Sequence, residues 1–344
     1  MKLLELDTTF SRDYFTDKFG IEFGEDYFFD VKTRVMTDQR VKQALYGAFG
    51  KYGLGDKDPD PVYQMGFDDT LNIILYFGGE INVRKGVSWV KPGFIKDIDE
   101  IMELKVPSID QGPFYELLEK KFDEGVSLYG KDAVRAPKPH GILECALEMC
   151  GTDFFEYIIT EKEAADHLLD VLTETVIAFR EFWNWKCYGE DRKGIELGSC
   201  STTVMSPAQV KEMLVPRYNR IASRFKKGFL CSCGPSTHNL ENFRLVEDAY
   251  YVRCGWGTDF RKASEILRGR HLKAGLDVPR ASDLTPEEFS KDALGVLEDI
   301  RDMEVASLLL IHASAKTPDE NIAALIETVR RWTKDNNVEL VQHY

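Results

Sequence analysis

The chain has 344 residues and a mass of 39.3 kDa, with 43% hydrophobic, 30% charged and 12% aromatic residues. This balance is typical of a globular protein and excludes a disordered chain or a fibre. The 58 acidic and 44 basic side chains give a net charge of −14, which disfavours nucleic acid as a partner because it would be repelled. No apolar run in the sequence reaches the roughly 18 residues of a membrane helix. Seven cysteines, an odd number, favour a reducing cytoplasmic setting over a disulfide framework.

The predicted elements divide the chain into residues 1–61 and residues 62–344. The first part is polar and charge-rich, and we expect a helical arm packed on the rest of the chain. In the second part short apolar runs alternate with amphipathic stretches, as in a single α/β domain. The predicted strands are residues 71–77, 194–197, 229–233, 249–254, 272–276 and 307–311. The predicted helices are residues 161–185, 208–225, 286–303 and 318–333.

Two of these helices have start signals, in which a hydroxyl residue precedes a proline: Ser206-Pro207 and Thr317-Pro318. Strands that alternate with long helices predict parallel βα units. The fold class is therefore α/β, with a (β/α)8 barrel carrying an N-terminal helical extension as the first choice and a doubly wound sheet as the second. In either architecture functional residues gather at the C-terminal ends of the strands. The sequence has no GxGxxG or phosphate-loop motif, which weakens a nucleotide-binding interpretation.

The most informative motif is Cys231-Ser232-Cys233-Gly234, at the end of the predicted strand 229–233. Side chains two apart on a strand point to the same side, so both thiols would face the end of the barrel where active sites form. Thiolates suit zinc, and a catalytic zinc usually has three protein ligands and one open position. The alternative is two small buried residues, since free cysteine is often buried.

A zinc site needs a third ligand, for which the sequence offers three candidates. His312 follows the strand 307–311 and is the first choice, because it also sits at a strand's C-terminal end. Cys254, at the end of strand 249–254, is the next choice, and His238, five residues after Cys233, is the last. The alternative role for His312 is a hydrogen-bonded residue that shapes the pocket.

Two acidic residues are candidates for substrate contact. Asp69, in Phe67-Asp68-Asp69-Thr70-Leu71, either points into the barrel mouth, where it binds substrate or transfers a proton, or belongs to a solvated pair that caps an element. Asp277 ends the strand 272–276 and either lines the pocket or forms a turn before Pro279.

Taken in order, several segments resemble the uroporphyrinogen decarboxylase superfamily, and within it the cobalamin-dependent methyltransferases that methylate coenzyme M. The resemblance covers about residues 62–335 and implies a (β/α)8 barrel. The segments that carry it are FDDTL (67–71), MSPAQVKEMLVPRYNRI (205–221), FLCSCG (229–234), LKAGLDVP (272–279) and TPDENIAALIE (317–327).

The resemblance also implies a cofactor and a reaction. These methyltransferases hold zinc with His-x-Cys-Gly and a later cysteine; here the corresponding ligands would be Cys231, Cys233 and His312, with the imidazole and one thiolate exchanged. The implied reaction moves a methyl group between a corrinoid, carried by a separate protein, and a thiol or another small molecule. Asp69 and Asp277 would orient the substrate.

The superfamily leaves two other functions open. The first is a decarboxylase or another lyase, whose loop acid would be Asp69 and whose C-terminal histidine would be His312. The decarboxylases' Arg-Gln-Ala-Gly-Arg segment is missing from this sequence, and Leu147 falls where they have a tyrosine, so we place this function below methyl transfer. The second is a non-catalytic relative that binds a corrinoid or a tetrapyrrole.

Overall fold

The computed structural model describes residues 1–68, 70–190, 192–276 and 278–343. Its strands are β1 (Leu3–Phe10), β2 (Tyr63–Gln64), β3 (Ile81–Arg84), β4 (Val87–Val90), β5 (Val134–Arg135), β6 (Ile195–Gly198), β7 (Gly228–Cys231), β8 (Ala249–Cys254), β9 (His271–Leu276), β10 (Val305–Ala313) and β11 (Glu339–His343).

The helices up to β6 are α1 (Arg12–Phe19), α2 (Glu25–Phe29), α3 (Val31–Phe49), α4 (Leu71–Ile74), α5 (Ile98–Glu103), α6 (Pro113–Tyr129), α7 (Ile142–Cys150), α8 (Asp153–Thr160) and α9 (Lys162–Tyr188). Those that follow are α10 (Pro207–Gln209), α11 (Val215–Phe225), α12 (Leu240–Arg244), α13 (Phe260–Ile266), α14 (Val278–Asp283), α15 (Pro286–Ile300) and α16 (Asp319–Asp335).

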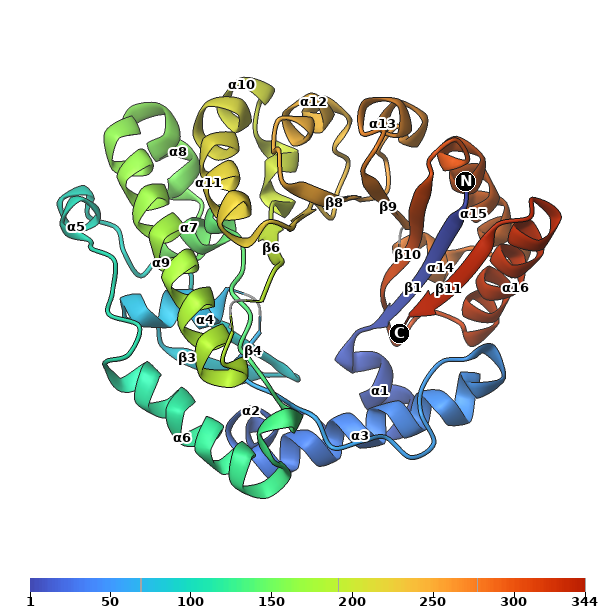
Figure 1. Cartoon of the computed structure of the whole chain (residues 1–344), viewed down its shortest axis with the longest axis horizontal. Coiled ribbons are helices and arrows are strands. Elements are labelled where there is room, and N and C mark those ends of the chain that lie inside the picture. The colour runs from blue at the N-terminus through green and yellow to red at the C-terminus, as the bar shows by residue number, and fades with distance from the viewer. Residues whose placement is uncertain (69, 191, 277, 344) are drawn as a thin grey trace.

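Parallel strands form the inside of a ring, and helices surround them (Figure 1). Seven strands make one sheet in the order β11-β1-β10-β9-β8-β7-β6, and every pairing in it is parallel. β2 and β5 pair with each other in parallel, while β3 and β4 form an antiparallel hairpin. In the described part of the chain no ladder joins β5 to β6, so hydrogen bonds do not close the ring. The architecture confirms the predicted α/β class with a barrel-like arrangement of strands.

The sheet separates an apolar layer under the helices from a polar interior. In β1, Leu4 and Leu6 are buried, whereas Glu5 and Asp7 alternate with them and both pair with Lys273, which reaches them from β9, two strands away. In β10, Leu308 and Leu310 are fully buried and pack in the same apolar core as the helices. Burial on the helix side drives the sheet to form, and it leaves the opposite face free for polar and reactive groups.

The structure corrects two of the predicted elements. Residues 1–61 include the expected helices α1 to α3, but Leu3–Phe10 form a strand within the sheet, between β10 and β11. The predicted strand 71–77 is instead the short helix α4 followed by a 3-10 turn, with Leu71 and Ile73 buried. A short apolar run does not by itself distinguish a buried helix from a buried strand.

The other predicted strands correspond to β6 to β10, and the four predicted helices are present, with ends shifted by up to three residues. Ser206 caps α10 in a capping box with Gln209, as its position before a proline predicts. The prediction for Thr317 is wrong, because Pro318 is the N-cap of α16 and the Thr317 hydroxyl instead accepts a hydrogen bond from the Ser314 amide. Among the described helices, none combines the length and apolar character needed to cross a bilayer.

Candidate metal and active site

Three cysteine thiols meet where β6 and β7 end. Cys200 lies two residues after β6, Cys231 is the last residue of β7, and Cys233 lies two residues further along the chain. All three sulfurs lie within 4.8 Å of one another. The Sγ atoms of Cys200 and Cys233 are 2.7 Å apart, and those of Cys231 and Cys233 are 3.9 Å apart. Because the strands are parallel, the thiols occupy the end of the ring at which barrel enzymes bind substrate.

The thiols lie at different depths, and one of them contacts a cation. Cys231 is buried, Cys200 is half-buried and Cys233 is exposed. Arg253, on β8, donates a hydrogen bond from Nη2 to the Cys233 sulfur at 2.8 Å. Hydrogen bonds from Cys200 and Cys231, together with the Arg253 charge, hold the pKa of Cys233 well below its usual range. The group therefore favours a thiolate at its solvent-facing member.

The other two thiols hold their protons more tightly. The hydrogen bonds of Cys231 to Cys200 and Cys233, and its burial, raise its pKa. The hydrogen bond of Cys200 to Cys231 lowers the pKa of Cys200, but Cys233 and burial outweigh it and raise this pKa to about 12. Without a metal, the negative charge of the group therefore lies on Cys233, while Cys200 and Cys231 keep their protons.

Close packing of backbone segments fixes the two loops that carry the thiols. A Cβ atom at Gly255, just after β8, would lie 1.9 Å from the Cys233 carbonyl oxygen, so only glycine allows this loop to sit where it does. The Ser201 amide, next to Cys200, donates to Glu144 of α7 at 2.9 Å. The neighbouring Ser199 hydroxyl donates to the buried Tyr218 hydroxyl of α11 at 2.6 Å. Helices on both sides of β6 therefore set the position of Cys200.

The structure brings Cys231 and Cys233 together but adds Cys200 as the third member of the group. His312, the candidate preferred from the sequence, is outside this group; it lies near the end of β10, is exposed, and donates its backbone amide to the Thr9 hydroxyl. Cys254 is buried at the end of β8, where burial raises its pKa to about 12. His238 is exposed, in the middle of the 3-10 turn formed by Thr237–Asn239.

Sequence reasoning did not consider Cys200, although a signal for it exists. Gly198-Ser199-Cys200 directly follows the predicted strand 194–197. In a parallel barrel that position lies at the same end as Cys231-Ser232-Cys233.

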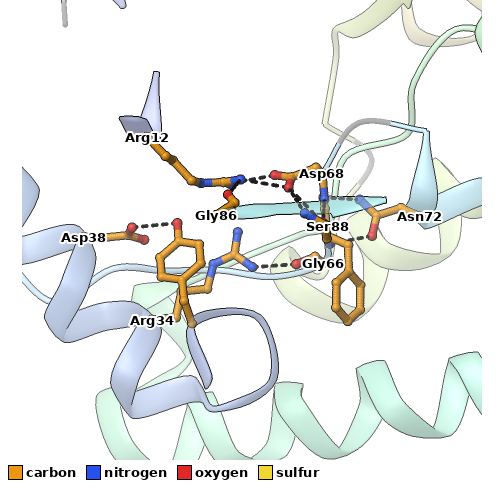
Figure 2. A network of polar contacts seen from close by, with 10 residues as sticks. Arg12, Arg34, Asp38, Gly66, Asp68, Asn72, Gly86 and Ser88 are labelled. Carbon is orange, nitrogen blue, oxygen red and sulfur yellow. Dashed lines mark hydrogen bonds and ion pairs between the residues drawn. The ribbon is translucent and has the colours of Figure 1, made fainter. Parts of the chain in front are cut away.

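Asp69 and Asp277, the two predicted substrate-contacting acids, lie outside the described residues. Figure 2 shows how the neighbouring Asp68 is held at the C-terminal ends of β1 and β2. Arg12, the first residue of α1, donates from both terminal nitrogens to the Asp68 carboxylate, at 2.8 and 2.6 Å. The backbone amide and hydroxyl of Ser88, on β4, donate to the same carboxylate. Burial opposes the ionised form of Asp68, but Arg12 and Ser88 outweigh it and lower the pKa.

The same network fixes the backbone on either side of Asp68. Arg34 of α3 donates to the Gly66 carbonyl at 2.6 Å, and the Asn72 side chain bonds to both the amide and the carbonyl of Phe67. Arg12 also donates to Gly86, at the tip of the β3–β4 hairpin. The loop after β2 is therefore bound to helices, to the hairpin and to itself, beside the mouth of the ring.

Comparisons with known proteins support the fold. No protein-family model matches the sequence, and no curated protein matches it. Among solved structures, a methyltransferase from Methanosarcina mazei superposes with a TM-score of 0.63 at 16% identity, over 96% of this chain and 94% of that one. A B12-independent methionine synthase from a Shewanella species gives a TM-score of 0.45 at 11% identity, over 88% of this chain and 91% of that one. The likeness to the first structure, at this low identity, establishes a shared fold.

Proposed function

We propose that the protein is a methyltransferase whose reactive centre is a zinc ion held by Cys200, Cys231 and Cys233. The observation that carries this proposal is the group of three thiols within 4.8 Å, at the substrate end of a barrel-like fold. The fold is shared with a methyltransferase, and the sequence segments around the thiols resemble those of zinc-dependent methyltransferases. In this ligand set the thiol of Cys200 takes the place of His312, the third ligand predicted from the sequence.

The thiol group fits a zinc ion in both distance and chemistry. Zinc–sulfur bonds of about 2.3 Å in a tetrahedral site place two sulfurs about 3.8 Å apart. Cys231 and Cys233 already lie at 3.9 Å, while the 2.7 Å between Cys200 and Cys233 would have to widen by about 1 Å. Cys200 and Cys233, which would move, are less buried than Cys231. Soft thiolates select zinc over the hard cations that prefer oxygen ligands.

Charge balance gives Arg253 a role in the same site. Three thiolates and one zinc ion carry a net charge of −1, and the Arg253 guanidinium contacts the Cys233 sulfur directly. A cation at this position stabilises the ionised thiols and keeps Cys233 oriented toward the other two sulfurs. A zinc ion bound here would lower the pKa of a substrate thiol in its open position, so that the thiolate is present at neutral pH.

The remaining parts of the proposal concern the substrates. We propose a corrinoid, presented by a separate carrier protein, as the methyl carrier, and a small thiol as the other substrate. Support comes from the resemblance of FLCSCG and of the segment 205–221 to the corrinoid-linked branch. The exposed side of the thiol group, where Cys233 reaches solvent, leaves a large partner a route to the site.

The test is a methyl-transfer assay with methylcobalamin and a panel of small thiols, on zinc-loaded protein under reducing conditions. We expect loss of the methylcobalamin absorbance together with a methyl thioether detected by mass spectrometry. Cys233→Ser should reduce the rate at least 100-fold. Cys187→Ala, which alters a buried cysteine of α9 outside the thiol group, should keep the rate within a factor of about two.

Three outcomes would contradict this function. Equal rates in Cys233→Ser and in the native chain would remove the thiol group from the reaction. Turnover of a porphyrinogen, with no methyl transfer to any thiol, would establish the decarboxylase instead, and corrinoid binding without turnover would establish the non-catalytic relative.

A further inference from the structure

A cavity of about 310 Å³ lies inside the ring at the opposite end of the strands from the thiols. Two of its lining residues, Gly194 and Lys227, immediately precede β6 and β7. Phe229, another lining residue, lies two positions before Cys231 on β7, a rise of about 7 Å. The cavity and the thiol group are therefore separate places in the same barrel.

The charge of this lining is opposite to that of the whole molecule. Of the described lining residues, four are cationic and one, Glu196, is acidic, although acidic residues outnumber basic ones by 58 to 44 in the chain. Lys273 is paired with Asp7 of β1 at 2.9 Å. The other three cations, Lys138, Arg180 and Lys227, form no ion pair with any residue that the structure describes. Glu196 offsets only one of these three charges, so the lining of the cavity keeps an excess of positive charge.

Arg180, on α9, contributes one of these positive charges to the cavity wall. Its Nη2 donates a hydrogen bond to the Gly194 carbonyl at 3.2 Å, which holds the guanidinium beside the start of β6. An anion in the cavity would reduce the repulsion among Lys138, Arg180 and Lys227.

The wall of the cavity toward β7 and β8 is aromatic. The rings of Phe229 and Tyr251 lie 6.1 Å apart and nearly perpendicular, at 74°. The Lys273 ammonium lies 5.5 and 5.4 Å from their centroids. Ile195 and Pro139 add further apolar surface. Such a wall favours a flat apolar body over a fully hydrated ion.

We propose that this cavity binds a small anionic molecule with an aromatic body, and that it does so independently of the thiol group. The acid group of the ligand lies among Lys138, Arg180 and Lys227, and the ring packs against Phe229 and Tyr251. Glu196 accepts a hydrogen bond from a donor group on the ligand. The site is distinct from the proposed zinc centre and holds whether or not the chain transfers methyl groups.

The test is isothermal titration calorimetry of the full chain at low salt with three probes: 2-naphthoate, its uncharged analogue 2-naphthamide, and inorganic phosphate. We expect 2-naphthoate to bind at one site per chain and at least tenfold more tightly than either other probe. The double variant Lys138→Gln/Lys227→Gln should weaken 2-naphthoate binding at least tenfold. Lys120→Gln, which removes the charge of an exposed lysine on α6 away from the cavity, should change it less than twofold.

Cys233→Ser locates the bound probe and separates this proposal from the proposed function. We expect 2-naphthoate to bind this variant within a factor of two of the native affinity, because the cavity does not include the thiols. Loss of binding in Cys233→Ser would place the probe at the thiol end and overturn the proposal. The proposal would also be overturned by no saturable binding up to millimolar 2-naphthoate, by equal binding of the amide or of phosphate, or by an unchanged double variant.

Discussion

The seven-stranded sheet and the segment 63–141 form two sides of the same ring, but different contacts hold them in place (Figure 1). In the sheet, neighbouring strands satisfy one another's backbone groups through parallel ladders of up to seven paired residues. In the segment 63–141, β2 and β5 share only two paired residues. Side chains replace the missing ladder there, since Arg34 bonds to the Gly66 carbonyl and Gln64 bonds to the Ala136 carbonyl.

The comparison shows in which region the stability depends on single side chains. A backbone group that is hydrogen-bonded to a neighbouring strand keeps that partner when a side chain is replaced. A carbonyl that is hydrogen-bonded to an arginine side chain loses its partner when that arginine is replaced. The segment 63–141 should therefore be more sensitive to individual substitutions of polar residues. The sheet should be sensitive mainly where a titratable group is buried.

The largest effect is expected from Arg12→Ala, which tests the segment 63–141. It removes two hydrogen bonds to Asp68, one to Gly86 and the stacking of the guanidinium on Phe23, Tyr27 and Phe28. Arg12 and Asp68 are only 25% and 22% exposed, so an unpaired carboxylate would remain in a poorly solvated place. We expect the free energy of unfolding to fall by about 3 kcal/mol, measured by urea denaturation.

The matched control is Arg261→Ala, whose pair with Asp299 is 71% and 35% exposed. An exposed pair of this kind contributes about 0.5 kcal/mol. Equal losses in the two variants would contradict the view that buried side-chain contacts replace the ladder in this segment.

The next effect concerns Lys121 of α6, a buried cation on the same side of the ring. Burial, with the nearby Arg34 charge, lowers the pKa of Lys121 to about 7, and its ammonium donates to the Phe28 carbonyl. Between pH 7 and 9 the unfolded chain holds this proton more tightly than the folded chain, so stability should rise with pH. We expect a rise of about 2 kcal/mol that Lys121→Met abolishes. Lys120→Met, on the exposed side of α6, should leave the slope unchanged, and a slope that persists in Lys121→Met would disprove this origin.

The smallest effect is expected from His271, a buried titratable group within the sheet. His271, on β9, is 1% exposed and shares a hydrogen bond with the Ser307 hydroxyl at 2.7 Å. Burial lowers its pKa to about 4, against the influence of Glu5. Below pH 6.5 the unfolded chain takes up a proton that the folded chain does not, so stability should fall as the pH decreases from 6.5 to 4.

We expect this residue to account for about 1–2 kcal/mol of the stability lost between pH 7 and pH 5. His271→Gln should reduce the loss by that amount, measured by thermal unfolding at both pH values. His238→Gln, at an exposed position, serves as the control. An identical acid loss in the native chain and in His271→Gln would show that the buried imidazole is not its source.

The sequence predicts the sheet better than the segment 63–141, and the contrast has a physical reason. Strands β6 to β10 are buried parallel strands, which appear in a sequence as short apolar runs between helices. The contacts that hold the loop after β2 join residues far apart in the chain, such as Arg34 to Gly66 and Arg12 to Asp68. No local pattern predicts such pairs. β1 was missed because its alternating pattern, Leu4 and Leu6 between polar residues, lies in a charge-rich segment.

The thiol group was predicted in part for a similar reason. Cys231 and Cys233 are close in sequence, so their meeting follows from the local chain. Cys200 joins them only because β6 and β7 are neighbours in register, with Gly198 paired to Cys231. The sequence predicts the strand before Cys200, but it does not show that this strand pairs with β7. It therefore favours His312 as the third ligand, although His312 lies near the end of another strand, β10.

The zinc content of the purified chain tests the proposed centre most directly. It should be measured by inductively coupled plasma mass spectrometry under reducing conditions, in the native chain, Cys200→Ser and His312→Ala. We predict about one zinc per chain in the native protein and in His312→Ala, and less than a tenth of that in Cys200→Ser. Zinc that is retained in Cys200→Ser but lost in His312→Ala, or a native chain that binds no zinc when the metal is supplied, would contradict the three-thiol centre.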